Sequence, residues 1–312
     1  MTSINAGLDF DWRLRIAAFS ELRRLRDLGG GVITAGQLES GFAFEGETIR
    51  FRDEWRGIWR PRQLGIDGAA LSVVTVVPRK GRERPYDDEV RSDADYFIYK
   101  YEGTDPNLHR NRALRVAMQT QRPIIYFYGL SPAVYDPIFP VFIEAEDPSN
   151  LAFHLRAGTD AVRFEAVFPE TTISVQRQYA TAAVKVRLHQ RRFRELVISA
   201  YRSRCTICEL RHRPLLDAAH IIEDRDERGL AEVPNGLSLC RIHHAAYDAN
   251  ILGISPDFVV AIRGDILAEV DGPMLKHGLQ AMNGHRIHLP RSSQHRPNPD
   301  YLDVRFSRFK AA

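Results

Sequence analysis

The sequence predicts an α+β protein built from two domains. The chain has 312 residues, and a typical domain length of about 150 residues suits two of them. Up to about residue 165, short β-branched and aromatic runs alternate with Gly, Pro and Asp, as in strands joined by turns. From residue 179 the apolar residues recur at helical spacing. These patterns predict domains over 1–165 and 187–312, joined by a linker over 166–186.

The composition agrees with this class. Hydrophobic residues make up 44% of the chain, charged residues 27% and aromatic residues 10%, which excludes a disordered or collagen-like protein. The longest apolar runs, such as 71–77, have the length of a strand, so we expect no membrane-spanning segment. Asp9, Asp11, Arg13 and Arg15 interrupt the apolar stretch that a signal peptide would need. We therefore expect a cytoplasmic protein.

The N-terminal part is expected to be mainly β-structure. Its strands are predicted in the runs 31–36, 70–78, 95–103, 122–129 and 140–146. A helix is predicted over Asn111–Gln121, where Leu114, Ala117 and Met118 have helical spacing and Pro123 follows the end.

The C-terminal part is expected to begin with a helix over Tyr179–Arg204. The apolar residues on one face of that helix are Leu188, Phe193, Leu196, Val197 and Ala200. Shorter elements follow Cys205: a strand through Leu215 and Asp217, a loop over 223–234 and a helix that begins near Leu239.

Basic residues are concentrated around this helix. The net charge of +3 is too small to indicate a polyanionic partner, but the segment 184–214 holds nine basic and two acidic residues. Such a block suits a surface that faces phosphates, so we assign Arg191, Arg192 and Arg194 to a nucleic-acid backbone. A solvated helix face is the alternative.

All three cysteines belong to a metal-ligand pattern. Cys205-x2-Cys208 is followed, after 31 residues, by Cys240-x2-His243. Two such pairs supply the four ligands of a closed structural zinc site, whereas an odd number of cysteines cannot all form disulfides within one chain. Zinc would join the two ends of a charged, loop-rich segment. Unrelated buried thiols are the alternative.

Between the two pairs lies an ordered set of histidine, asparagine and histidine. His220 stands in the run LDAAHI, Asn235 begins NGLSL, and His244 precedes Tyr247-Asp248. Over about residues 187–270 this pattern resembles the HNH (ββα-metal) nuclease family. The resemblance implies a zinc-stabilised ββα-metal domain that hydrolyses phosphodiester bonds. Isolated histidines of the core or the surface are the alternative.

The same resemblance implies roles for these residues. His220 is the candidate general base, because a neutral imidazole accepts a proton near physiological pH. Asn235 would orient His220 and brace the loop between the strands, and a plain Asn-Gly turn is its alternative. His243 is used for zinc, so His244 is the candidate ligand of the catalytic metal. One imidazole among oxygen ligands favours Mg²⁺ or Mn²⁺.

The second ligand of that metal is left open by the sequence. Many HNH enzymes have it directly before the base, where this chain has Ala219. Asp217 shares the strand face of Ala219, and Asp248 lies one helical turn after His244. We rank Asp217 ahead of Asp248, and a structural role is the alternative for each.

Four runs of the N-terminal part resemble a second family: GIWRPRQLGIDGAALSVVTVV, RPYDDEV, DYFIYKYEG and HRNRALRVAMQTQRPIIYFYG. Over about residues 25–160 they are similar to the SRA (SET and RING associated) domain, a PUA-like β-rich barrel that binds modified cytosine in duplex DNA by base flipping. A flipped base is stacked between aromatic faces and hydrogen-bonded along its edge. The resemblance implies Tyr86 and Tyr101 as the stacking residues and Asp88 as the edge acceptor.

Some assignments within this resemblance stay open. Asp87 or Glu89 is the alternative to Asp88, and Tyr99 the alternative to Tyr101; each tyrosine has core packing as a further alternative. Three residues at the start of the predicted helix are candidates for phosphate contacts, with a solvated helix start as the alternative: Arg110, Asn111 and Arg112.

Together the two resemblances predict a type IV-like, modification-dependent restriction endonuclease of bacteria. It would recognise 5-methylcytosine or 5-hydroxymethylcytosine in double-stranded DNA by base flipping and cut with its HNH domain. A homodimer is expected, since a duplex has two strands and one HNH site cuts one. The alternatives are a non-catalytic modified-DNA-binding protein and an HNH nicking or repair nuclease that reads another DNA feature.

Overall fold

A computed structural model describes residues 9–77, 96–158, 170–223, 226 and 229–312. By contacts between residues, the chain divides into two compact units, Met1–Leu188 and His189–Ala312. None of the helices in the described residues combines the length and the apolar character that crossing a membrane requires.

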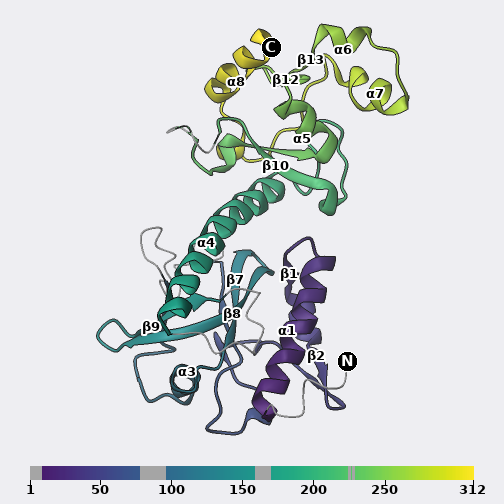
Figure 1. Ribbon diagram of the computed structural model, residues 1–312. Helices are drawn as coiled ribbons and strands as arrows, with labels where there is room; N and C mark the ends of the chain where they lie inside the picture. The colour runs from purple at the N-terminus through teal and green to yellow at the C-terminus, as the bar shows by residue number, and fades with distance from the viewer. Residues whose placement is uncertain (1–8, 78–95, 159–169, 224–225, 227–228) are drawn as a thin grey trace. The chain divides into compact units, whose positions relative to one another are not determined.

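The N-terminal unit is built on a curled, mixed sheet (Figure 1). Within the described residues it has seven strands, in the order β4-β5-β7-β8-β9-β6, with β1 paired to β8. Bulges in the β7–β8 and β8–β9 pairs bend these strands and account for the curl. The strands are β1 (Ile33–Thr34), β4 (Ile58–Trp59), β5 (Ser72–Thr75), β6 (Phe97–Lys100), β7 (Ile124–Ser131), β8 (Val134–Asp147) and β9 (Ala152–Ala157).

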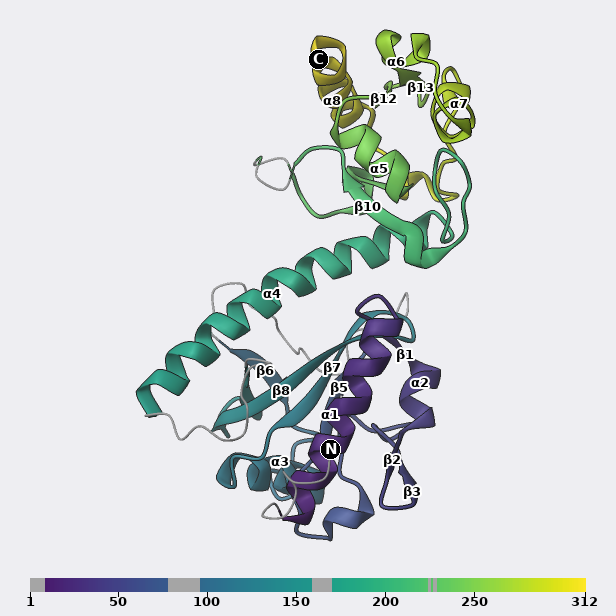
Figure 2. The ribbon, with the colours of Figure 1, turned by 45° about the vertical axis from the view of Figure 1, so that its right-hand side comes forward.

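Alternation along the central strands places a core on each face of this sheet. On β7, Ile124 and Tyr126 face one core, whereas Ile125 and Phe127 face the other. The first core is covered by α3 (His109–Gln119) and by the part of α4 (Glu170–Ala200) that belongs to this unit. The second is covered by α1 (Phe10–Leu28). Figure 2 shows α2 (Ala35–Ser40) and the hairpin of β2 (Phe42–Phe44) and β3 (Glu47–Ile49) beside α1.

Helix α1 is absent from the sequence prediction, and its charged residues explain the omission. Asp9 caps the helix by accepting a hydrogen bond of 2.9 Å from the Trp12 N–H. Arg15 is fully buried and donates to the carbonyl oxygens of Ala70 and Pro123 at 2.9 and 2.7 Å. Its Nε also lies 2.7 Å from an Asp11 oxygen. The charged residues that interrupt the apolar pattern therefore have structural roles: Asp9 caps the helix, and Arg15 forms buried hydrogen bonds.

The C-terminal unit starts from a ββα motif. Strands β10 (Leu216–His220) and β11 (Gly236–Cys240) pair antiparallel, and α5 (Arg241–Asp248) follows directly. The predicted helix from Leu239 thus begins two residues later, because Leu237 and Leu239 are strand residues in the core. The remaining elements are β12 (Leu252–Ile254), β13 (Val260–Ile262), α6 (Gly264–Ala268), α7 (Pro273–Gly278) and α8 (Pro299–Ala311).

Short 3-10 helices connect several of these elements. They span Arg62–Leu64, Arg213–Leu215, Val233–Asn235, Gln280–Met282 and Ser293–His295. On α4, Phe193 and Val197 are buried as the sequence pattern predicts, but Leu196 is exposed. Ile198 is buried instead, so the apolar face is turned slightly from the predicted one.

We expect Arg15→Ala to lower the free energy of unfolding of the N-terminal unit by about 3–5 kcal/mol, because the change leaves Asp11 and two buried carbonyls without their cation. All the tryptophans of the chain lie in this unit, so their fluorescence during urea unfolding follows it selectively. Arg24→Ala breaks an exposed pair with Glu21 and should leave the midpoint nearly unchanged. Equal shifts for both variants would contradict the internal role of Arg15.

Candidate metal cluster and active site

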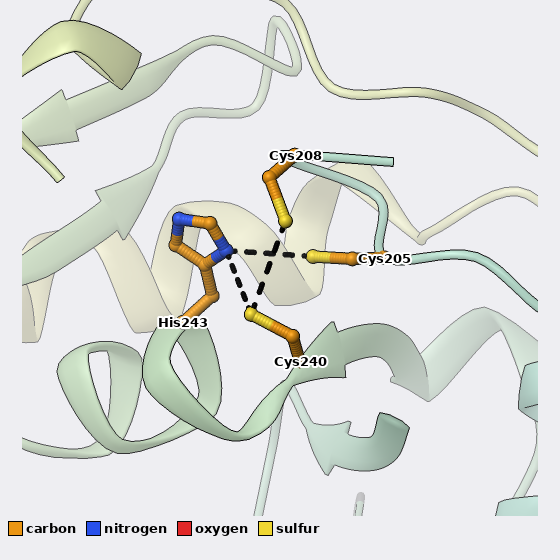
Figure 3. A group of neighbouring side chains, drawn as sticks. All are labelled: Cys205, Cys208, Cys240 and His243. Atoms are coloured by element: carbon orange, nitrogen blue, oxygen red, sulfur yellow. Dashed lines mark hydrogen bonds between the residues drawn. The ribbon is translucent and has the colours of Figure 1, made fainter. Parts of the chain in front are cut away.

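Four side chains from three places in the chain converge in the C-terminal unit (Figure 3). Cys205 and Cys208 follow α4, Cys240 ends β11, and His243 lies in the first turn of α5. The Nδ1 atom of His243 is 3.5 Å from the Cys205 sulfur and 3.2 Å from the Cys240 sulfur. The sulfurs of Cys208 and Cys240 are 3.9 Å apart. All four ligand atoms lie within 4.8 Å of one another.

These separations fit a tetrahedral zinc ion. Zn–S bonds of about 2.3 Å and Zn–N bonds of about 2.0 Å place tetrahedral ligand sulfurs about 3.8 Å apart, and sulfur and nitrogen about 3.5 Å apart. The other ring nitrogen of His243 lies 2.7 Å from the Gly278 carbonyl oxygen, to which its N–H donates. That hydrogen bond leaves the lone pair of Nδ1 for the ion. The donor set is therefore complete and correctly oriented.

The same four groups compete for protons. Burial lowers the pKa of His243, but hydrogen bonds to Cys208 and Cys240 outweigh burial and raise that pKa to about 10. Hydrogen bonds to Cys208 and Cys240 raise the pKa of Cys205, whereas those to Cys205 and Cys208 lower the pKa of Cys240. Negative charge is therefore favoured on Cys240. A divalent cation is the partner that satisfies all four ligands together.

His220 lies at the end of β10, opposite Gly236 of β11. Its imidazole stacks on the ring of Phe193 from α4, with ring centroids 4.0 Å apart and planes inclined by 14°. Gly236 makes this packing feasible, because a Cβ atom there would lie 2.3 Å from Val197 Cγ2 and 3.0 Å from Phe193 Cζ. The candidate base therefore has one ring face covered and a defined orientation.

Asn235 is buried and bonds to the backbone beyond His220. Its side-chain oxygen accepts from the Ile222 N–H at 2.8 Å, and its amide nitrogen donates to the Ile222 and Leu230 carbonyls at 3.0 Å. These three bonds close both ends of the connection between β10 and β11. Asn235 therefore acts on the backbone two residues after His220.

His244 lies between the two candidate carboxylates. Its Nδ1 is 3.7 Å from Asp217 Oδ2 on β10, and its Nε2 is 3.4 Å from Asp248 Oδ2 on its own helix. Asp217 is held from its other side, where Oδ1 accepts from the Ala218 N–H at 2.9 Å and lies 3.3 Å from Arg194 Nε. The structure thus brings together the three residues that the sequence proposes for the catalytic metal.

The arginines assigned to a nucleic-acid backbone differ from one another. Arg194 donates to the carbonyl oxygens of Leu216 at 2.7 Å and Arg213 at 3.4 Å, and it pairs with Glu195 at 3.1 Å. Its guanidinium therefore has partners inside the fold, although about a quarter of the side chain is exposed. Arg192 is exposed, and Arg191 is half-buried.

In the N-terminal unit, part of the predicted base pocket lies outside the described residues: Tyr86, Asp87, Asp88 and Glu89. Tyr101 is 1% exposed, its hydroxyl donates to Glu146, and its ring packs on Phe153 at 5.0 Å. Burial and the Glu146 carboxylate raise the pKa of Tyr101 to about 12. Tyr99 is also buried, edge-on to Tyr126 at 6.0 Å. Both tyrosines therefore contribute to the core of the sheet.

A cavity of about 180 Å³ nevertheless opens beside Tyr99 and Tyr101. It is smaller than the roughly 300 Å³ at which pockets for drug-sized ligands begin, so only a small group would fit there. Trp55, which the sequence interpretation passed over, lines this cavity and is 83% exposed. Other residues of the lining are Arg52, Glu54, Arg56, Lys100 and Glu102.

The start of α3 borders a second cavity, of about 130 Å³. Arg110 lines this cavity and forms an ion pair with Glu102. Arg112 is exposed, whereas Asn111 is buried and donates to the carbonyl oxygens of Glu102 and Asp105 at 3.1 and 2.9 Å. Asn111 is therefore a structural residue rather than a phosphate contact.

Comparison with known proteins identifies the C-terminal motif. Residues 205–255 match the family model described as HNH endonuclease, and this segment contains the metal cluster, His220, Asn235 and His244. Curated proteins gave no match. Among solved structures, the chain is similar to one described as "Modification dependent TagI restriction endonuclease", at 15% identity and a TM-score of 0.31 over 82% of this chain and 86% of that chain. The chain therefore contains an HNH endonuclease domain and is a nuclease.

Proposed function

We propose that this nuclease is a modification-dependent restriction endonuclease that cuts double-stranded DNA carrying 5-methylcytosine or 5-hydroxymethylcytosine. The observation that carries the proposal is the ββα motif. In this motif His220 ends strand β10, and His244 on helix α5 lies next to Asp217 on the same strand. A complete set of this kind argues against a non-catalytic DNA-binding protein. Because one HNH site cuts one strand, cleavage of both strands of the duplex suits a homodimer.

In the proposed reaction, His220 accepts the proton of the attacking water, and its stacking on Phe193 keeps the imidazole in one plane. His244 and a neighbouring carboxylate would hold Mg²⁺ or Mn²⁺, which offsets negative charge on the phosphorane and the leaving oxygen when bound. Asn235 holds the backbone after His220, so the base stays at the strand end. The Cys₃His cluster would hold structural zinc.

Recognition is assigned to the N-terminal unit as an SRA-like reader. The support is a small cavity that is lined by aromatic, cationic and carboxylate side chains, as a flipped base requires. Trp55 adds an exposed aromatic face to the residues that the sequence proposes. An HNH nicking or repair nuclease that reads another DNA feature is the rival, and it predicts no dependence on cytosine modification.

The central test is cleavage of matched plasmids with and without modified cytosine, in Mg²⁺ or Mn²⁺. We expect cleavage of the modified plasmid alone, and loss of cleavage in His220→Ala with retained binding of modified DNA, because the base acts on water rather than on DNA recognition. His212→Ala, at an exposed histidine of the same unit, is the control and should cut normally. Wild-type rates in His220→Ala would remove the base from this mechanism, and equal cutting of both plasmids would favour the rival.

Metal analysis of chelator-washed protein should find about one tightly bound zinc per chain, as one four-ligand site requires. Cys240→Ala should release this zinc and unfold the C-terminal unit, because structural zinc contributes directly to folding. The tryptophan fluorescence of the N-terminal unit should stay unchanged in the same variant. A folded, zinc-free protein with full activity would contradict the assignment.

Arg192 and Arg194 offer a matched test of DNA contacts. Arg192→Gln should weaken binding of modified and unmodified duplexes alike and reduce the salt slope of binding by about 1, because an exposed cation releases one counterion. Arg194→Gln should leave the salt slope unchanged, since its guanidinium is engaged by Leu216 and Asp217. The measurement is fluorescence anisotropy over a range of salt concentrations. A reduced slope in Arg194→Gln would keep this residue in the DNA interface.

A further inference from the structure

The two aspartates beside His244 approach opposite nitrogens of one imidazole. Asp217 Oδ2 is 3.7 Å from Nδ1, and Asp248 Oδ2 is 3.4 Å from Nε2. Metal ligands at bond lengths of about 2.1 Å lie at most about 4.2 Å apart. Each nitrogen therefore has one carboxylate within reach of a shared ion. The two ring nitrogens point away from each other, so one ion bound to His244 cannot take both aspartates.

We propose that the two carboxylates have different roles: Asp217 shares the catalytic ion with Nδ1 of His244, and Asp248 is a positioning residue that holds the ring from Nε2. The inference rests on the proposed metal-dependent cleavage and assigns its ligands. On this assignment Asp217 and Asp248 are no longer alternative ligands of the same ion.

The other contacts of Asp217 orient its carboxylate for metal binding. The Ala218 N–H and Arg194 Nε both approach Oδ1, at 2.9 and 3.3 Å, which leaves Oδ2 directed at His244. Arg194 is itself fixed by the Leu216 carbonyl oxygen and by Glu195. Asp217 also belongs to β10, the strand that ends in His220. An ion held by Asp217 and His244 would therefore lie between the strand of the base and helix α5.

Asp248 is suited to orient the ring. It lies one helical turn after His244, the spacing at which two side chains of a helix meet. A carboxylate that accepts from Nε2–H fixes the tautomer and leaves the lone pair of Nδ1 for an ion. His243 shows the same division, with Nδ1 toward the sulfurs and Nε2–H donating to the Gly278 carbonyl. Adjacent histidines of α5 would thus use the same nitrogen for metal.

Binding of Mn²⁺ to the full-length, zinc-loaded chain tests the assignment, measured without DNA from the electron paramagnetic resonance signal of free Mn²⁺. Asp217→Asn and Asp248→Asn are matched substitutions at exposed or half-exposed positions. Asp217→Asn should lose Mn²⁺ binding, because it removes a charged ligand. Asp248→Asn should weaken binding about 10–100-fold, as the loss of an orienting partner does.

Cleavage of modified DNA over a Mn²⁺ titration supplies a second readout. Activity of Asp248→Asn should recover at high Mn²⁺, because its coordination shell is intact, whereas Asp217→Asn should stay inactive at every concentration. The opposite order in the binding titration, equal losses, or no Mn²⁺ binding by the unsubstituted chain would overturn the assignment. If Mn²⁺ binds in the expected order but no DNA is cut, the proposed function fails and the ligand assignment stands.

Discussion

The nuclease centre depends on the Cys₃His cluster formed by Cys205, Cys208, Cys240 and His243. This cluster holds the first turn of α5 to the end of β11 and to the turn that follows α4. Successive residues of a helix point about 100° apart, so fixing the direction of His243 also fixes that of His244. The position of His244 between Asp217 and Asp248 is therefore a consequence of the cluster next to it.

Three consecutive residues of α4 support the same centre from the other side. Phe193 stacks on His220, Arg194 pairs with Asp217, and the buried Glu195 pairs with Arg194 and Arg213. Glu195 supplies a buried negative charge next to two arginines. The helix that the sequence marks as a basic surface thus also contributes the packing of the catalytic residues.

The sequence predicts best where the chemistry is local in the chain. Paired cysteines and the order of His220, Asn235 and His244 were sufficient to predict an HNH nuclease, which the family match confirms. Helix α1 was not predicted, because the charged residues that cap it and form its buried hydrogen bonds interrupt the spacing of the apolar residues. The sequence pattern treats Arg192 and Arg194 alike. Only the orientation of α4 against β10 shows that Arg192 is exposed whereas Arg194 pairs with Asp217. The cavity beside Trp55 combines segments far apart in the chain, so no local pattern could reveal it.

The hydrogen bonds of Asn235 have a consequence for how this enzyme tolerates change. One amide side chain bonds to the N–H and the carbonyl of Ile222 and to the carbonyl of Leu230. This side chain therefore ties the backbone of Ile222 to that of Leu230. Because the cost of closing a longer loop grows slowly with its length, we expect residues inserted between Ile222 and Leu230 to leave His220 in place. Such an insertion would add sequence to the nuclease at little cost to its chemistry.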